Sequence, residues 1–284
     1  MDFNTIDWNA LWQAESSASH WGKGSCSRKD IWDQRAAGFN QRISRLAEGK
    51  EDLDKDDYIS KMLNHIEVKP EWSVLDIGCG PGTLAVPLAK KAKSVTALDL
   101  SSEMLKHLKE NAESNELTNI QYINSSWIDA CANRQISPHD VVVASRSLMS
   151  GDIKEALSCI ISITRQAAYL TFPIIHLPFD WEVYKAIGRD GKKHPPYIYI
   201  YNLLFQMGIQ ANVEVLRSRI KVQFSSVEQA VNELQWRTET FSPEEMSRLT
   251  GFLKQKFSES KDSSVFTHEG YSKWALIWWK KEEQ

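Results

Sequence analysis

Two acids and three glycines between residues 73 and 100 have types and spacing that can bind a small polar ligand. They are Asp76, Gly78, Gly80, Gly82 and Asp99. Apolar runs at 74–77 and 94–98 predict two buried strands, and helical spacing at 84–91 predicts a helix between them. Each acid then lies at a strand end, and the glycines form a tight turn whose backbone N–H groups can approach a ligand closely. This β-turn-α-β unit predicts a pocket for a nucleoside-containing ligand.

The spacing of the glycines excludes two common phosphate-binding motifs. A dinucleotide fingerprint, G-x-G-x-x-G, that began at Gly78 would need glycine at position 83, which is Thr83. A phosphate loop, G-x-x-x-x-G-K-[ST], is also missing from this stretch. Asp76 inside the turn disfavours a polyphosphate and favours a cation, whereas Asp99 suits a bidentate hydrogen bond to two ribose hydroxyls. An NAD-dependent oxidoreductase is therefore disfavoured.

The elements that must position these residues alternate between strand and helix from 58 to 173. Further strands are predicted at 121–123, 141–144 and 167–172, the last ending at Pro173. This alternation predicts a parallel sheet with right-handed crossovers. In such a sheet, ligands bind at the carboxyl ends of the strands, where the strand order reverses.

The regions on either side of 58–173 do not show the regular alternation of strand and helix. Tryptophans and a helical pattern at 31–46 favour an N-terminal helix that either packs on the core or closes over a ligand as a lid. After Pro173, residues 176–196 are expected to be irregular. Later segments are expected as helices at 197–207, 227–234 and 244–257 and as strands at 213–216, 220–224 and 274–279.

The composition is that of a soluble globular protein. The net charge of −3 gives no electrostatic reason to expect a nucleic acid or membrane partner. No apolar run approaches the roughly 20 residues that span a bilayer, and the N-terminus has no signal-peptide pattern. The four cysteines match no metal-binding spacing, and with so few we expect reduced thiols and no disulfide framework. These features favour a cytoplasmic protein without a metal site.

The run DIGCGPG at 76–82, followed by Asp99, resembles motif I and the next acid of the class I S-adenosylmethionine-dependent methyltransferases. The resemblance covers about residues 58–175. It implies an α/β, doubly wound, mostly parallel seven-stranded Rossmann-like sheet, with 274–279 as an antiparallel last strand. On this basis we expect an N-terminal helical lid or extension at 1–57. A methyltransferase domain at 58–284 would then contain acceptor-side insertions at 176–270.

The resemblance also implies that the cofactor is S-adenosyl-L-methionine and its product S-adenosyl-L-homocysteine. It places Asp76 near the methionine amino group, the three glycines beneath the cofactor and Asp99 on the ribose. The family usually has an acidic residue that contacts the adenine amine, and this sequence has Ser126 at that place. Ser126, Trp127 and Asp129 are therefore the alternatives for the adenine contact. The expected cofactor-binding residues are Asp76, Gly78, Gly80, Gly82, Asp99, Leu100, Ser126, Trp127 and Ser145.

The acceptor side carries no recognisable catalytic motif. Arg146 and His176 are the candidate catalytic residues. Arg146, beside the tip of the fourth strand, can hold an acceptor carboxylate or pair with a nearby acid, and His176 either takes part in catalysis or is a surface residue. We predict in-line methyl transfer to a small organic acceptor by a monomer or homodimer. The alternatives are a protein side-chain methyltransferase and a non-catalytic module that binds S-adenosylmethionine.

Overall fold

The computed structural model describes residues 5–18, 29–47, 58–148, 151–175, 178–189, 195–237, 241–260 and 264–281. The helices are α1 (Trp8–Ala18), α2 (Lys29–Ala47), α3 (Tyr58–His65), α4 (Ala85–Ala89), α5 (Ser102–Ser114), α6 (Trp127–Ala132), α7 (Ile153–Ile163), α8 (Pro178–Ile187), α9 (Tyr197–Gln206), α10 (Val227–Arg237) and α11 (Pro243–Ser258). The strands are β1 (Ser73–Ile77), β2 (Ser94–Asp99), β3 (Ile120–Asn124), β4 (His139–Ser145), β5 (Thr164–Ile175), β6 (Asn212–Phe224) and β7 (Phe266–Lys280). Within these ranges, no helix is both long and apolar enough to cross a membrane.

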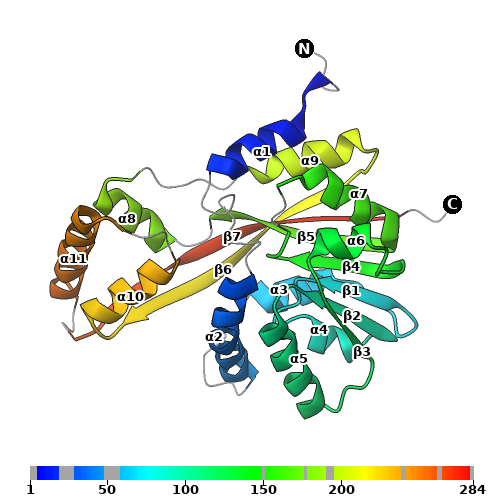
Figure 1. The fold of residues 1–284 in the computed structure, drawn as a ribbon, viewed down its shortest axis with the longest axis horizontal. Helices are drawn as coiled ribbons and strands as arrows, with labels where there is room; N and C mark the ends of the chain where they lie inside the picture. The colour runs from blue at the N-terminus through cyan, green and yellow to red at the C-terminus, as the bar shows by residue number, and fades with distance from the viewer. Residues whose placement is uncertain are drawn as a thin grey trace. The chain divides into compact units, whose positions relative to one another are not determined.

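The strands form one seven-stranded sheet in the order β3-β2-β1-β4-β5-β7-β6 (Figure 1). β1 pairs in parallel with β2 on one side and with β4 on the other, so the strand order reverses at β1. Pairing of β2 with β3 and of β4 with β5 is also parallel. The predicted Rossmann-like fold class is confirmed, and the carboxyl ends of the first five strands share one edge of the sheet.

Helices cover both faces of this sheet because its strands are apolar on both sides. On one face, Leu75 and Val142 pack in a core with residues of α1, α6, α7 and α9. On the other face, Val74 and Val141 pack in a second core with residues of α3, α4 and α5. Adjacent residues of one strand thus belong to opposite cores, as the two-residue period of a strand requires.

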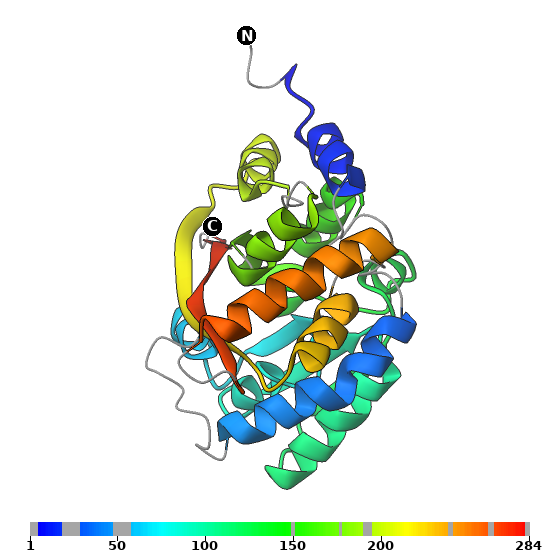
Figure 2. The same ribbon diagram turned by 90° about the vertical axis from the view of Figure 1, so that its left-hand side faces the viewer.

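The chain divides into two compact units. The first unit comprises residues 1–174, 194–216 and 274–284, and the second comprises 175–193 and 217–273. The second unit has its own aromatic core, in which the rings of Phe179, Phe224 and Phe266 contact one another. Within this unit α10 and α11 pack against each other (Figure 2).

Two expectations after the fifth strand are wrong in detail. β5 does not end at Pro173 but continues to Ile175. Pro173 lies beyond Thr171, the last residue paired with β4, so its missing N–H removes no hydrogen bond on that side. The segment expected to be irregular contains α8, whose first residue is Pro178, and proline is well tolerated in the first turn of a helix.

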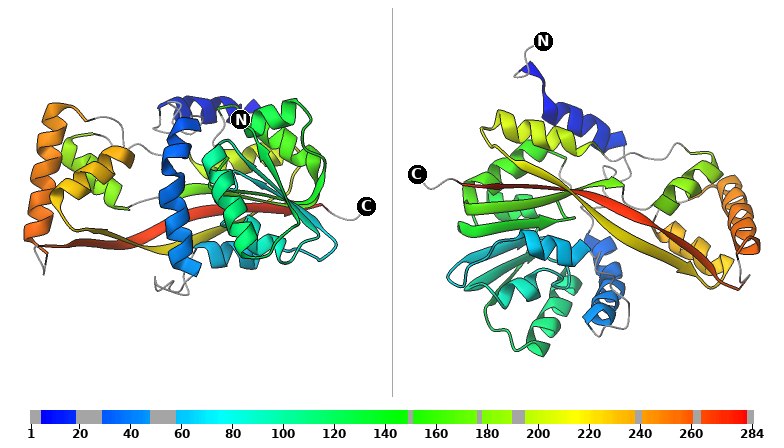
Figure 3. Two further views of the ribbon diagram at one scale, coloured as in Figure 1. Left: turned by 60° about the horizontal axis from the view of Figure 1, so that its bottom comes forward. Right: turned by 180° about the vertical axis from the view of Figure 1, so that it is seen from behind.

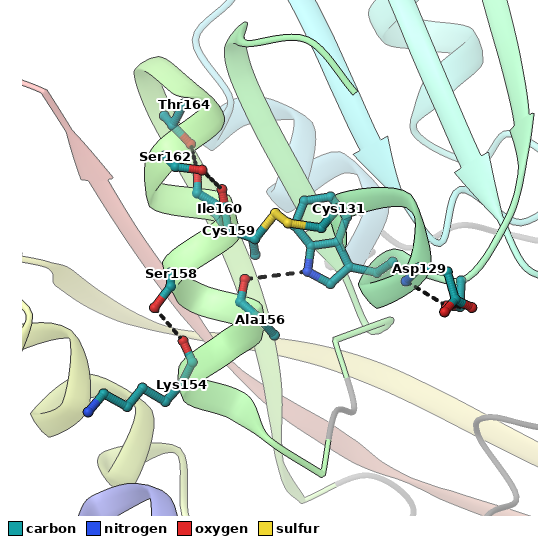
Figure 4. Close-up of a disulfide and its surroundings, with 11 residues drawn as sticks. Asp129, Cys131, Lys154, Ala156, Ser158, Cys159, Ile160, Ser162 and Thr164 are labelled. Atoms are coloured by element: carbon teal, nitrogen blue, oxygen red, sulfur yellow. Dashed lines mark hydrogen bonds between the residues drawn. A yellow bond between two sulfur atoms is a disulfide. The ribbon is translucent and has the colours of Figure 1, made fainter. Parts of the chain in front are cut away.

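The expectation of fully reduced cysteines is also wrong. Cys131 at the end of α6 and Cys159 in α7 form a disulfide, with Cα atoms 6.4 Å apart (Figure 4). The pairing spans 28 residues and arises because α6 and α7 pack on the same face of the sheet. Cys79, in the glycine turn, is a buried free thiol, and burial raises its pKa well above the ordinary value.

Candidate active site

The glycine turn connects β1 to α4 and is tied to the neighbouring strand. The backbone N–H groups of Gly78 and Cys79 both donate to the carbonyl of Leu98 in β2, at 2.7 and 3.0 Å. Gly78, Gly80 and Gly82 have positive φ angles of 68°, 54° and 95°, which L-residues with a side chain rarely adopt. The turn therefore depends on glycine at all three alternate positions.

The three glycines differ in what surrounds them. A Cβ atom on Gly78 would lie 2.3 Å from Cβ of Ser147, and one on Gly82 would lie 2.3 Å from Cδ1 of Leu108. For Gly80 the nearest heavy atom to such a Cβ is the sulfur of Met104, at 4.0 Å. Gly78 and Gly82 are thus required by packing within the protein, whereas Gly80 leaves room where a ligand can approach the backbone.

Asp76 in β1 is a buried carboxylate with an unsatisfied oxygen. Asp76 is 2% exposed, and its Oδ2 atom has no hydrogen-bond partner within the part of the chain that the structure describes. Burial and the nearby charge of Asp99 raise the pKa of Asp76 to about 7, although the backbone N–H of Ala85 opposes this shift. An unsatisfied buried carboxylate costs free energy, so this oxygen fits a cationic ligand group.

Asp99 at the end of β2 organises the same turn. Its Oδ2 accepts from the backbone N–H of Gly80 at 2.8 Å, and its Oδ1 accepts from that of Ser101 at 2.9 Å. Burial raises the pKa of Asp99, and these two hydrogen bonds oppose that rise. A carboxylate has about four acceptor positions, so Asp99 retains capacity for ligand hydroxyls. Leu100 follows it and is partly buried.

Ser126 and Trp127 follow β3, and one is a polar helix cap while the other is buried in the core. Ser126 caps α6: its Oγ accepts from the backbone N–H of Asp129 at 3.1 Å and donates to the Asp129 carboxylate at 2.5 Å. Trp127 is 8% exposed and packs in the core, with its indole N–H donating to the carbonyl of Ala156 in α7. Ser126 and Asp129 thus form one polar pair, while the Trp127 ring belongs mainly to the core.

A cluster of hydroxyls lies at the ends of β4 and β5. The Tyr58 hydroxyl is 2.8 Å from Oγ of Ser145 and 2.8 Å from Oγ1 of Thr171. Burial raises the pKa of Tyr58, so the phenol stays protonated near neutral pH. Sequence reasoning missed Tyr58 and Thr171. Thr171 lies near the end of a predicted strand, but Tyr58 precedes the motif by 18 residues and carries no local signal.

Arg146 extends over the aromatic residues of this cluster. Its guanidinium carbon lies 4.3 Å from the centre of the Tyr58 ring and 5.8 Å from that of Trp274. Its backbone has a positive φ of 58°, and its N–H donates to Oγ1 of Thr171. The proposed ion pair with a nearby acid is not formed with any residue in the described part of the chain. His176 lies outside the described residues.

Helix α2 lies alongside α5 and is bonded to residues near the glycine turn (Figure 3). The Asp33 carboxylate accepts from the Ser101 hydroxyl at 2.6 Å. Asn111 donates to the Asn40 side chain and to the carbonyl of Pro81 in the glycine turn, each at 2.8 Å. The N-terminal helix is thus bonded to the residues that surround the turn.

Known proteins resemble this chain in both sequence and fold. Residues 74–167 match a family model described as a methyltransferase domain. An uncharacterised protein of Haemophilus influenzae is 32% identical over 249 residues, which are 87% of this chain and 88% of that protein. The ubiquinone biosynthesis O-methyltransferase of Albidiferax ferrireducens is 30% identical over 146 residues, 50% of this chain and 53% of that enzyme.

A solved Bacillus halodurans structure, assigned as a candidate methyltransferase, superposes with a TM-score of 0.54. It is 17% identical and covers 80% of this chain and 99% of its own, so it supports the fold. The strand order agrees with this likeness, and the methyltransferase-domain match includes the glycine turn and both strand-end acids. This enzyme therefore belongs to the class I S-adenosylmethionine-dependent methyltransferases.

Proposed function

We propose that the enzyme transfers the methyl group of S-adenosylmethionine in line to a small organic acceptor. The observation that carries the proposal is the unsatisfied Oδ2 of buried Asp76, next to a glycine turn that is open at Gly80. The methionine part of the cofactor carries an ammonium group, which is the kind of cation that this carboxylate lacks.

The residues around the turn fit the remaining parts of the cofactor. Asp99 has free acceptor positions for the ribose hydroxyls, and Leu100 offers an apolar surface for one face of the adenine. Ser126 and Asp129 provide a polar edge that can meet the adenine amine, because their mutual hydrogen bonds leave lone pairs available. Gly78 and Gly82 keep the turn close to Ser147 and Leu108, and with Gly80 they form the backbone surface on which the cofactor is proposed to lie.

When bound, S-adenosylmethionine supplies an electrophilic methyl group on a sulfonium. The contribution of the protein is alignment, since holding the acceptor in line with the carbon–sulfur bond lowers much of the barrier. Tyr58 is a poor base near neutrality because burial raises its pKa, so its hydroxyl serves as a positioned hydrogen-bonding group. The hydroxyls of Ser145 and Thr171 keep it in place.

The ends of β4 and β5 support a small acceptor. There the buried Tyr58 and Trp274 provide apolar surface, while Ser145 and Arg146 provide polar groups. Pockets for small molecules combine these features, with a few polar groups on an apolar lining. The net charge of −3 does not favour a polyanionic acceptor such as RNA.

Calorimetry and a product assay test this proposal. We expect S-adenosylhomocysteine to bind and NAD not to bind, and we expect product release with members of a broad panel of small acceptors. Methylation of peptides alone would favour the protein side-chain alternative. Tight binding without turnover on either panel would favour a non-catalytic binding module, and preferential NAD binding would contradict the assignment of the pocket.

A further inference from the structure

We propose that Arg146 binds a carboxylate on the methyl acceptor, so that the enzyme selects small carboxylate-bearing acceptors. The inference rests on the proposed function and names the acceptor class for the same site. It starts from the position of Arg146, one residue beyond the end of β4 and within the hydroxyl cluster. Three observations support it.

First, the positive charge of Arg146 has no carboxylate partner in the described part of the chain. The side chain is exposed, yet its guanidinium lies over the face of Tyr58 and near Trp274. A cation over an aromatic face is held in place while the N–H groups at its edge remain available. This edge is the part of a guanidinium that binds a carboxylate through two parallel hydrogen bonds.

Second, the backbone of Arg146 is held in a conformation that costs free energy. A positive φ of 58° at a residue with a long side chain is uncommon. The N–H of Arg146 donates to Oγ1 of Thr171 at 2.9 Å, and Thr171 contacts the Tyr58 hydroxyl in turn. The same threonine thus holds both the backbone of Arg146 and the ring under its guanidinium, which is typical of a constrained binding group.

Third, Arg146 lies on the acceptor side of the pocket. The glycine turn follows β1 and Asp99 ends β2, where the cofactor is proposed to bind. Arg146 follows β4, and its partners Thr171, Tyr58 and Trp274 belong to β5, α3 and β7. β4 pairs directly with β1, with Val143 opposite Asp76, and the charges of both Arg146 and Asp76 act on the pKa of the Tyr58 hydroxyl. A ligand that reaches Arg146 therefore adjoins the cofactor.

A panel of matched ligands tests the inference. Aromatic and aliphatic carboxylic acids are compared with their primary amides in two assays, S-adenosylhomocysteine release and ligand-observed NMR on the complex with S-adenosylhomocysteine. We expect each acid that binds to have an affinity at least about tenfold higher than that of its amide, because a hydrogen bond to a charged group is stronger than one to a neutral group. Arg146→Met should abolish this preference, and Arg146→Lys should retain part of it.

Arg134→Met is the matched control. Arg134 is an exposed arginine with a φ of 52°, just beyond the end of α6, so the substitution makes the same change of charge in the same backbone conformation. We expect Arg134→Met to keep the preference for acids. Affinity for S-adenosylhomocysteine should stay within about twofold in both variants, and circular dichroism should show that both are folded.

Three results would overturn the inference. Acids in the panel that bind no better than their amides would remove the carboxylate from the acceptor class. A full preference for acids in Arg146→Met would remove Arg146 from its recognition. A tenfold loss of S-adenosylhomocysteine affinity in that variant would assign the guanidinium to the cofactor instead. Failure of the proposed function would give a different result, because the wild-type enzyme would then release no S-adenosylhomocysteine with any acceptor. The binding assay does not need turnover, so it would still test whether Arg146 binds a carboxylate.

Discussion

Asp76 and Asp99 lie at the ends of neighbouring parallel strands, and the charge of Asp99 adds to burial in raising the pKa of Asp76 to about 7. Two carboxylates so close together repel each other when both are charged. The N–H groups of Gly80 and Ser101 donate to the Asp99 carboxylate, but the Oδ2 of Asp76 has no hydrogen-bond partner among the described residues. The pair is therefore organised to accept a cation at Asp76.

This arrangement predicts a pH-dependent affinity for the cofactor product. An ammonium group binds the ionised form of Asp76. Below pH 7 the Asp76 side chain is mainly protonated, so it must lose its proton before the ligand binds. We expect S-adenosylhomocysteine affinity, measured by calorimetry, to fall by up to about tenfold per pH unit below 7 and to level off above it until the ammonium group of the ligand deprotonates. Asp76→Asn should bind weakly with a flat profile. An equally flat profile in the wild type would contradict the role of Asp76.

Asp140→Asn is a suitable control for that experiment. Asp140 lies in β4 at the opposite end of the strand from Ser145, and hydrogen bonds from Ser73 together with the charge of Arg165 lower the pKa of Asp140. Its carboxylate is therefore charged throughout the range in which Asp76 titrates. We expect this variant to keep the wild-type pH profile for S-adenosylhomocysteine.

The same pKa shift predicts how stability changes with pH in the unliganded enzyme. The pKa of Asp76 is higher in the folded state, about 7, than its ordinary value of 3.8, so the folded state binds this proton more tightly. The resulting stabilisation is fully present below about pH 4 and is lost as pH rises through 7, by on the order of 4 kcal/mol. Urea unfolding at a series of pH values gives the unfolding free energy of the wild type and of Asp76→Asn. The same dependence of this free energy on pH in both proteins would contradict the prediction.

The glycine turn predicts different effects for three alanine substitutions. Gly78→Ala and Gly82→Ala place a Cβ within 2.3 Å of Ser147 and Leu108, so we expect a loss of about 2–4 kcal/mol in unfolding free energy. Gly80→Ala meets only the backbone penalty of a positive φ, about 1–2 kcal/mol. Calorimetry should nevertheless show that Gly80→Ala binds S-adenosylhomocysteine about tenfold more weakly. Full affinity in this variant would mean that no ligand approaches Gly80.

Attachment of α2 to α5 is predicted to depend on Asn40. Its side chain accepts from Asn111 at 2.8 Å and contacts the His107 ring at 3.2 Å. Asn40→Ala removes both contacts, so amide hydrogen exchange at residues 29–41 should become faster. The control is Gln34→Ala, since Gln34 is an exposed residue of the same helix. Equal protection in both variants would show that other contacts hold α2.

The disulfide between Cys131 and Cys159 predicts a redox-dependent stability. The disulfide closes a span of 28 residues and so lowers the conformational entropy of the unfolded chain. This stabilises the folded state by about 3–4 kcal/mol. We expect a phosphine reductant to lower the melting temperature of the wild type and to leave that of Cys159→Ser unchanged. Peptide mapping without reduction should recover both cysteines in one linked fragment, and recovery of two free peptides would contradict the pairing.

Local sequence, together with the resemblance of its glycine motif to a known family, was sufficient to predict the cofactor class and the sheet. The glycines and Asp76 stand within seven consecutive residues, and Asp99 follows at the end of the next strand, so their spacing alone specifies the turn. The alternating apolar runs likewise predict parallel strands, because burial on both faces requires continuous apolar sequence. The family assignment follows from these short-range features.

Tertiary packing decided what lies beyond the turn. Tyr58 and Ser145 are 87 residues apart in sequence, and no local pattern shows that their hydroxyls meet. The contact between Arg146 and Trp274, the pairing of Cys131 with Cys159 and the open space at Gly80 depend likewise on which helices cover each face of the sheet. A strand end is a local property of the chain, whereas the surroundings of its side chain depend on segments that only folding brings together.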